Sequence, residues 1–320
     1  MRKLRAASIA LLVLVLSVTT ACGGGAPPLS AAPAAAPVAP TAAPAPIVVT
    51  DDRGKTFTSP TAPKRVVSLA PSATEIVFAL GAGASLVAVD DFSDYPAEAK
   101  ALPKLGGYRA SPERIVVHQP DVILAITSGN LAEQLDAMGQ KVVVMDPVGL
   151  AGVYRNIVMI GTLLDRKSAA DELVAKMRSQ IGSVAERAAK ASTRPRVMHQ
   201  IDSTNPTKVY VAGKDSYIDE IMRLVGATNI AGSSATKYPI LSGEEIVRSD
   251  PEIIILSDAR FGATPEGVGA RPGHAGISAV RTKRILPIDD DLVSRPGPRL
   301  VLGVEAYAKL VHPEIFGAAP

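Results

Sequence analysis

One short segment of this sequence occurs twice, and this repeat constrains the fold more than any other feature. The segment SPERIVVHQPDVILA spans residues 111–125, and SGEEIVRSDPEIIIL spans residues 242–256. A serine, a glutamate, an Ile-Val pair, a proline, an acid and an apolar run recur in the same order without a gap. The repeat predicts a helix start followed by a buried strand in each half of the chain.

Short apolar runs flank both copies and alternate with helical segments. The runs are rich in β-branched residues and lack polar alternation, which is typical of strands covered on both faces in a parallel sheet. The helical pattern SATEIVFALGAG at residues 72–83 is echoed by SYIDEIMRLVGA at residues 216–227. Strands are expected within residues 65–70, 86–91, 121–126, 141–146, 196–201 and 252–257.

Between the two halves lies a stretch without any strand-like run, at residues 148–192. Residues 168–192 favour a single helix, which would be about 35 Å long at a rise of ~1.5 Å per residue. One apolar stripe along this helix is formed by Leu173, Met177, Ile181 and Val184. Two lobes joined once by such a rigid helix would enclose a cleft and move little against each other.

These patterns predict the fold class and the division of the chain. The fold is α/β, with two similar lobes whose central sheets are mostly parallel, joined by one long α-helix. The second lobe is expected to be a divergent copy of the first. The expected boundaries are residues 47–150 for the first lobe, 151–192 for the helical segment and 193–320 for the second lobe.

The N-terminus has the pattern of an export signal. Arg2, Lys3 and Arg5 precede an apolar run at residues 6–18, which is too short to span a membrane comfortably. Cys22, the only cysteine in the chain, ends this segment. A lipoprotein signal with a lipidated cysteine is the favoured interpretation, and an ordinary signal peptide with an incidental cysteine is the alternative.

The signal also predicts where the protein works. Residues 1–22 are expected to be the lipoprotein signal peptide, and the Ala/Pro-rich residues 23–46 are expected to be an extended linker. The protein would therefore be extracytoplasmic and attached to the cell membrane by lipid. A net charge of +3 without a basic run or interleaved aromatics does not favour nucleic acid as a partner.

Both copies of the repeat carry good helix-start chemistry. Ser111 and Ser242 occupy N-cap positions, and Glu245 completes a capping box with Ser242. Glu113 and Glu244 fall in the first turn, where the helix dipole favours a carboxylate. From the residues alone, the two glutamates are either helix-start residues only or groups with a further role.

Six stretches carry a family resemblance: RVVSLAPSATEIVFALG, DFSDYP, SPERIVVHQPDVILA, GKDSYIDEIMRLVGATNI, SGEEIV and SRPGPR. Together they resemble the substrate-binding proteins of ABC importers for vitamin B12, iron-siderophores and haem. The resemblance implies two α/β lobes bridged by one long helix. It also implies that Glu113 and Glu244 dock into arginines of a dimeric ABC permease, which works with ATPase subunits.

Within this family, the loops DFSDYP, SGN, STNP, KYP and DLVSRPGPR resemble the cobalamin-binding branch. The resemblance implies a cobalamin-like ligand in the interlobe cleft. Because the chain has no tryptophan, stacking on the ligand would fall to tyrosines such as Tyr108 and Tyr238. The implied ligand-binding residues are Ser72, Phe92, Tyr108, Arg109, Ile126, Asn205, Tyr238, Asp291 and Arg295.

Other metal chelates remain open as ligands. Tyr108, with Arg109 nearby, could bind ferric haem through its phenolate. A ferric siderophore would be served by Arg109, Arg260, Phe261 and Arg295. A ligand sensor that acts on a membrane signalling partner is a further alternative.

The sequence contains no catalytic pattern. Its four histidines show neither an HExxH motif nor a paired spacing, and no Gly-x-Ser-x-Gly motif is present. The run of three aspartates at residues 289–291 is expected to form a solvated turn rather than a cation site. No catalytic residue is therefore assigned, and no metal ligand either, except Tyr108 if the ligand is haem.

Overall fold

The structure is a computed structural model that describes residues 45–106, 110–126 and 130–317. The chain divides into two units, residues 1–43 and Pro44–Pro320. Every element described below belongs to the second unit. The predicted lipidation site Cys22 lies outside the described residues, as do Tyr108 and Arg109. In the part of the chain that is described, no helix has both the length and the apolar character needed to cross a membrane.

The first lobe contains a parallel sheet with the strand order β4-β3-β5-β6. Its strands coincide with the β-branched runs predicted from the sequence, and nearly all of their residues are buried. This burial explains the lack of polar alternation, because both faces of the sheet are covered. The strands are β3 (Val66–Ser68), β4 (Leu86–Val89), β5 (Val122–Ile126) and β6 (Val142–Met145).

The second lobe repeats this plan and extends it at one edge. Strands β9, β7, β11 and β12 are parallel and follow the same spatial order as the strands of the first sheet. Strands β8 and β10 add an antiparallel extension beside β7, which the sequence patterns did not predict. The strands are β7 (Arg196–Asp202), β8 (Val209–Val211), β9 (Thr228–Asn229), β10 (Ile240–Leu241), β11 (Ile253–Leu256) and β12 (Ile285–Pro287).

The central strand pairs of the two sheets also have equivalent registers. Val66 in β3 lies opposite Val122 in β5, and Val197 in β7 lies opposite Ile253 in β11. The sequence spacing from Val66 to Val197 equals the spacing from Val122 to Ile253, so the two copies of the repeat occupy equivalent places. The prediction that the second lobe is a divergent copy of the first is therefore confirmed in strand topology.

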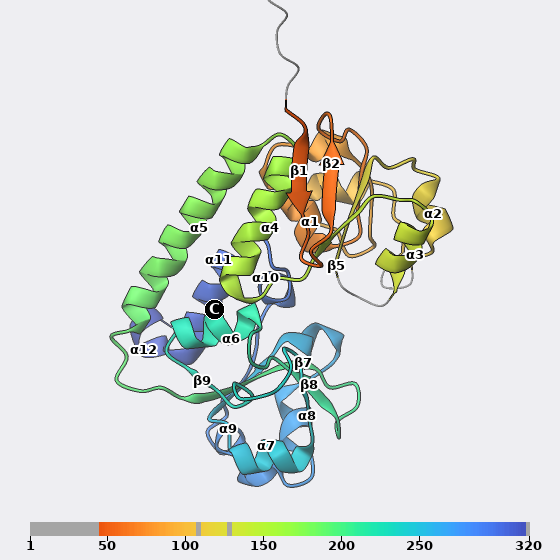
Figure 1. Cartoon of the computed structure of the whole chain (residues 1–320). Coiled ribbons are helices and arrows are strands. Elements are labelled where there is room, and N and C mark those ends of the chain that lie inside the picture. Colours follow the sequence, from red (N-terminus) through yellow and green to blue (C-terminus); the bar gives the residue numbers. More distant parts are fainter. Residues whose placement is uncertain (1–44, 107–109, 127–129, 318–320) are drawn as a thin grey trace, which may run out of the picture. The chain divides into compact units, whose positions relative to one another are not determined.

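Two consecutive helices connect the sheets. Helices α4 (Gly149–Leu163) and α5 (Lys167–Ala188) lie side by side, with α5 running along one edge of the molecule (Figure 1). Helix α5 has 22 residues and is therefore ~33 Å long, close to the predicted length. The predicted stripe faces inward, with Leu173 partly buried and the other members buried: Met177, Ile181 and Val184.

The remaining elements cover the sheets and close the ends of the chain. A hairpin precedes the first sheet, formed by β1 (Ile47–Thr50) and β2 (Thr56–Ser59). The other helices are α1 (Pro71–Ala79), α2 (Pro112–Val116), α3 (Leu131–Ala137), α6 (Tyr217–Leu224), α7 (Gly243–Ser249), α8 (Pro265–Gly269), α9 (Ser278–Arg281), α10 (Asp290–Val293), α11 (Leu300–Val311) and α12 (Pro313–Phe316).

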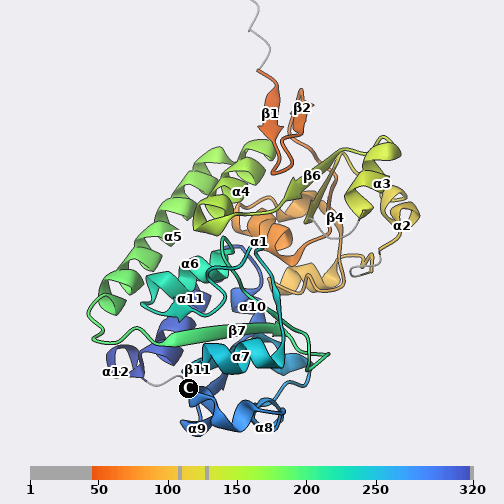
Figure 2. The ribbon, with the colours of Figure 1, turned by 60° about the horizontal axis from the view of Figure 1, so that its bottom comes forward.

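One hydrophobic core runs through both lobes. It joins the inner faces of the two sheets through buried side chains of α1, α4, α5, α6 and α11, such as Ile76, Ile157, Met177, Ile221 and Val304. Separate clusters lie on the outer faces of the sheets, one including side chains of α2 and α3 and another including side chains of α7, α8 and α9. Figure 2 shows α2 and α3 on the outside of the first lobe and α7, α8 and α9 on the outside of the second. Because the inner core is continuous, moving one lobe against the other would break apolar contacts in several helices at once.

A buried histidine makes the stability of this core depend on pH. The ring of His199 in β7 is fully buried, and its Nδ1 atom lies 2.9 Å from the hydroxyl oxygen of Tyr307. Burial lowers the pKa of His199 to about 3. In the unfolded chain the pKa is about 6.5, so acidification below that value protonates the unfolded state while the folded state stays neutral.

We therefore expect the free energy of unfolding to fall as the pH is lowered from about 6 to about 4, by up to ~1.4 kcal/mol per pH unit from this group. Urea unfolding of wild type and His199→Gln across this range checks the expectation. The variant should be less stable at neutral pH but show a shallower acid dependence. Equal slopes for both proteins would show that His199 does not contribute.

Candidate functional site

One pocket lies where the parallel strands of both sheets end. It is a cavity of about 340 Å³, lined by residues that follow β4, β5, β6, β11 and β12 and by the start of α1 and α6. In open parallel sheets this carboxyl edge is the usual position of a ligand. Six residues implied by the family resemblance line it: Ser72, Phe92, Ile126, Tyr238, Asp291 and Arg295.

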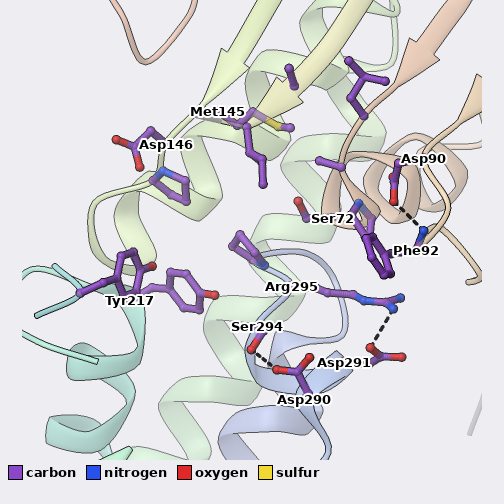
Figure 3. A pocket seen from close by; sticks show the side chains of 18 of the residues that line it. Ser72, Asp90, Phe92, Met145, Asp146, Tyr217, Asp290, Asp291, Ser294 and Arg295 are labelled. Carbon is purple, nitrogen blue, oxygen red and sulfur yellow. Dashed lines mark hydrogen bonds and ion pairs between the residues drawn. The ribbon is translucent and has the colours of Figure 1, made fainter. Parts of the chain in front are cut away.

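Aromatic rings form two walls of this pocket. Phe92 and Tyr238 are 41% and 42% exposed, and both contribute surface to the lining of the pocket. Tyr217, at the start of α6, also lines the pocket but is itself buried. Figure 3 shows Tyr217 on one side of the pocket, with Ser72 and Phe92 on the other.

The loop that carries Phe92 is fixed by a buried aspartate. Asp90 directly follows β4, and its Oδ1 atom accepts a hydrogen bond of 2.8 Å from the backbone N–H of Phe92. Its Oδ2 atom accepts a second one of 2.6 Å from the hydroxyl of Ser93. Phe92 is thus presented to the pocket by a constrained turn at the end of a strand.

Both arginines among the described lining residues are already paired with carboxylates. Arg295 lies 2.7 Å from Asp291 and 2.8 Å from Asp94. Arg260, in the short helical turn after β11, contacts Asp291 and lies 3.8 Å from Asp290. The rim of the pocket is therefore polar, yet it offers no uncommitted cation among the described lining residues.

The expectation of a solvated turn at residues 289–291 is wrong. Asp289 caps the short helix α10, and the next two carboxylates, of Asp290 and Asp291, line the pocket. Burial raises the pKa of Asp290. Arg260 from the segment after β11 pairs with these two carboxylates, and Ser294 and Arg295, which follow them in the sequence, contact them as well.

A buried glutamate connects the pocket to the opposite lobe. Glu75 on α1 of the first lobe accepts hydrogen bonds of 2.7 and 3.0 Å from Arg299 of the second lobe. It also lies 3.3 Å from Arg295. The side chain of Glu75 is only 2% exposed, so these contacts hold the pocket arginine against the first lobe in a region of low solvent access.

Other polar contacts cross between the lobes near the pocket. Glu220 on α6 accepts a hydrogen bond of 2.6 Å from the backbone N–H of Leu150 at the start of α4. Asp146, which follows β6 and lines the pocket, pairs with Lys237 beside Tyr238. Glu75 and Glu220 occupy corresponding positions in the two similar helices α1 and α6. In each lobe, the glutamate at this position contacts the chain beyond its own lobe.

A second cavity of about 930 Å³ continues from the pocket into the second lobe. The two cavities share Phe261, Asp290 and Ser294. Asp258 lines the second cavity and accepts hydrogen bonds of 2.9 Å from the buried Gln200 and 2.7 Å from Ser203. These polar residues were not singled out from the sequence, although Asp258 follows a predicted strand.

Of the other implied ligand-binding residues, only Asn205 belongs to the described part of the chain. Asn205 does not line either cavity: its side-chain oxygen accepts hydrogen bonds of 3.0 and 2.8 Å from the backbone and hydroxyl of Thr207 in an exposed turn. Tyr108 and Arg109 fall outside the described residues. Within the described ranges, no group of three or more His, Cys, Asp or Glu side chains could hold a metal ion.

The two glutamates of the repeat lie away from both cavities. Glu113 on α2 and Glu244 on α7 are exposed, and neither has an ion-pair partner in the part of the chain described. Ser111 and Ser242 cap these helices as predicted, and the capping box with Glu245 is complete. Hydrogen bonds from its own backbone and with Ser111 lower the pKa of Glu113, which keeps it ionised.

Comparison with known proteins agrees with this geometry. The model of the periplasmic binding protein family matches residues 66–292. An uncharacterised ABC transporter substrate-binding lipoprotein of Bacillus subtilis, YvrC, is 33% identical over 85% of this chain and 87% of its own. A vitamin B12-binding protein of Vibrio parahaemolyticus is 30% identical over 74% of this chain and 85% of its own.

A solved structure shows the same fold. The periplasmic haem-binding protein RhuT of Roseiflexus superposes with a TM-score of 0.69 at 26% identity, covering 78% of this chain and 97% of RhuT. These similarities confirm the predicted resemblance and the interpretation that the protein binds a substrate for transport and is not an enzyme. The chain belongs to the periplasmic binding protein family.

Proposed function

We propose that this protein is a lipid-anchored, extracytoplasmic receptor that captures a cobalamin-like ligand in the cleft and delivers it to an ABC importer. The observation that carries the ligand assignment is the pocket itself. It combines exposed aromatic rings with arginines that are already neutralised by carboxylates. Such a surface suits a broad, largely apolar ring system with peripheral amides, which need hydrogen bonds and not a counter-ion.

The second cavity supports the same assignment. Cobalamin is larger than a flat porphyrin and carries polar appendages beyond its ring. The cavity that continues past Phe261 is lined by Ser203, Thr204 and Asp258, which offer hydrogen-bond donors and acceptors for such groups. The name of the Vibrio parahaemolyticus relative points in the same direction.

Haem and ferric siderophores fit the described residues less well. Haem carries carboxylates, as do many siderophores, and the two arginines among the described lining residues of the pocket are already paired with Asp291. Arg271, which lines the second cavity, donates a hydrogen bond to the side-chain oxygen of Gln200. Burial raises the pKa of Tyr238 to about 12 and that of Tyr217 well above its ordinary value, so neither supplies a phenolate unless a bound cation lowers its pKa. Tyr108 remains the candidate axial ligand if the cargo is haem.

The ligand assignment predicts a loss of affinity when an aromatic wall is removed. Tyr238→Ala should weaken cyanocobalamin binding by about 2 kcal/mol or more, roughly thirty-fold, because a desolvated stacking surface is lost. Titration calorimetry measures this change. Tyr210→Ala is a matched control, because Tyr210 is 43% exposed in the same lobe and lines neither cavity.

Two outcomes would redirect the assignment. Absence of heat with cyanocobalamin, combined with a Soret shift on adding hemin, would make haem the cargo. If that shift also disappears in Tyr108→Phe, the tyrosine is the iron ligand.

Docking is proposed to depend on the two glutamates of the repeat. Glu113 and Glu244 each offer an exposed carboxylate from the outer helix of one lobe, which suits a permease with two similar halves. Replacing both with alanine should weaken docking at least a hundredfold, because interface charge pairs typically contribute about 1.5 kcal/mol or more each. Ligand affinity in solution should stay at the wild-type value.

Uptake into vesicles containing the permease, measured beside solution binding, checks this prediction. Glu133→Ala/Glu266→Ala is the matched control, because these residues are exposed glutamates in the first turns of α3 and α8, again one in each lobe. Normal uptake by Glu113→Ala/Glu244→Ala would mean that the repeated unit is only a helix-start motif.

A further inference from the structure

The internal repeat extends beyond the segment that the sequence alone displays. Arg65 precedes β3 and Arg196 begins β7, and the spacing between them equals the spacing between Ser111 and Ser242. The residue after each arginine pairs with the strand inside the corresponding copy of the repeat, Val66 with Val122 and Val197 with Ile253. The two arginines are therefore structural equivalents, and their contacts can be compared directly.

In the first lobe, Arg65 holds the chain just beyond helix α2. Its guanidinium donates hydrogen bonds of 2.6 Å to the carbonyl oxygen of His118 and 3.1 Å to that of Gln119. Asp121 accepts hydrogen bonds from the backbone N–H groups of Lys64 and Arg65, at 2.8 and 2.9 Å. Arg65 thus binds the chain before Asp121, and Asp121 in turn binds the backbone at Arg65.

The second lobe builds the same arrangement beyond helix α7. The guanidinium of Arg196 donates hydrogen bonds of 3.0 and 2.8 Å to the carbonyl oxygen of Asp250, the equivalent of Gln119. Glu252, the equivalent of Asp121, accepts one of 2.9 Å from the backbone N–H of Arg196. Gln119 and Asp250 also share a left-handed backbone, with φ of 48° and 40°. Asp250 is the C-cap of α7, whereas Gln119 lies three residues beyond the last residue of α2.

This arrangement matters because the two helices are very short. Helix α2 has five residues and α7 has seven, and helices of this length are marginal without tertiary attachments. A serine caps the start of each helix, and the arginine fixes the turn at its end. The position of the glutamate in each first turn is therefore set from both ends.

We propose that Arg65 and Arg196 are positioning residues for permease docking, each holding the helix that presents Glu113 or Glu244 against the central sheet of its lobe. This inference rests on the proposed docking function. The arginines act through the glutamates: each keeps its carboxylate in a fixed place, so that both can engage a two-fold partner at once. Each lobe has its own copy of the arginine, the short helix and the glutamate because each lobe makes its own docking contact.

The test measures the ATPase rate of the cognate permease complex in nanodiscs as a function of the concentration of ligand-free binding protein. Arg65→Gln/Arg196→Gln should raise the half-saturating concentration about tenfold or more and leave the saturated rate unchanged. Arg65→Lys/Arg196→Lys should recover part of the loss, because an ammonium group can still bind one carbonyl oxygen. Hydrogen exchange should accelerate at residues 112–119 and 243–250.

A matched control separates positioning from general stability. Arg284 also binds helix-end carbonyls, those of Leu310 and Val311 at the end of α11, at 2.9 and 3.0 Å. Arg284→Gln should destabilise the protein without changing the half-saturating concentration. If the double glutamine variant fails to fold, the single variants and the lysine pair carry the same test.

The outcomes distinguish this inference from the docking proposal. If Glu113→Ala/Glu244→Ala weakens docking but the arginine variants dock like wild type, the positioning role is wrong and docking stands. If Glu113→Ala/Glu244→Ala docks normally, the docking proposal is wrong, and the positioning role that rests on it is wrong as well. An equal effect of Arg284→Gln would also overturn the positioning role, because the loss would then reflect stability alone.

Discussion

The hydrophobic core shared by the two lobes is the constraint on which the rest of the structure depends. Helices α1, α4, α5, α6 and α11 bury one continuous cluster between the inner faces of the two sheets. The buried contacts of Glu75 with Arg299 and Arg295 add a polar connection at the pocket end of this layer. Because close-packed interiors do not deform continuously, the lobes are expected to behave as one body and to form a cleft of fixed width.

The chemistry of the cleft follows from this arrangement. Parallel strands of both sheets direct their carboxyl ends to the same space, so the loops that follow them supply almost the whole lining. Arg295 has two roles. Its guanidinium lines the pocket, and the same guanidinium connects the lobes through its ion pairs with Glu75 and Asp94. A ligand that competed for this guanidinium would therefore disturb the contact between the lobes, whereas a ligand that uses the rings and the rim would leave it intact.

Local patterns predicted the bridging helix, the helix caps and six strands (β3, β4, β5, β6, β7 and β11), because these depend on residues near each other in the sequence. The shorter or edge strands β1, β2, β8, β9, β10 and β12 were not predicted. Asp90 and Asp146 carried a usable signal, since each is an acidic residue at the end of a range predicted as a strand, and each directly follows the observed strand at the edge where ligands bind. The pairing of Asp290 and Asp291 with Arg260 could not be predicted, because Arg260 is about thirty residues away in the sequence. Tyr217 and the reciprocal contacts of Arg65 and Arg196 likewise became visible only once helix placement and strand register were known.

The most direct measurement is the distance between the lobes with and without ligand. Spin labels at Glu133→Cys and Glu266→Cys, on α3 and α8, report it by pulsed electron resonance, with Cys22→Ser removing the only native cysteine. The shared core predicts one narrow distance distribution that shifts by less than about 2 Å when cyanocobalamin or hemin is added to saturation. A bimodal distribution, or a larger shift on binding, would contradict the account, because the lobes would then move independently of their common core.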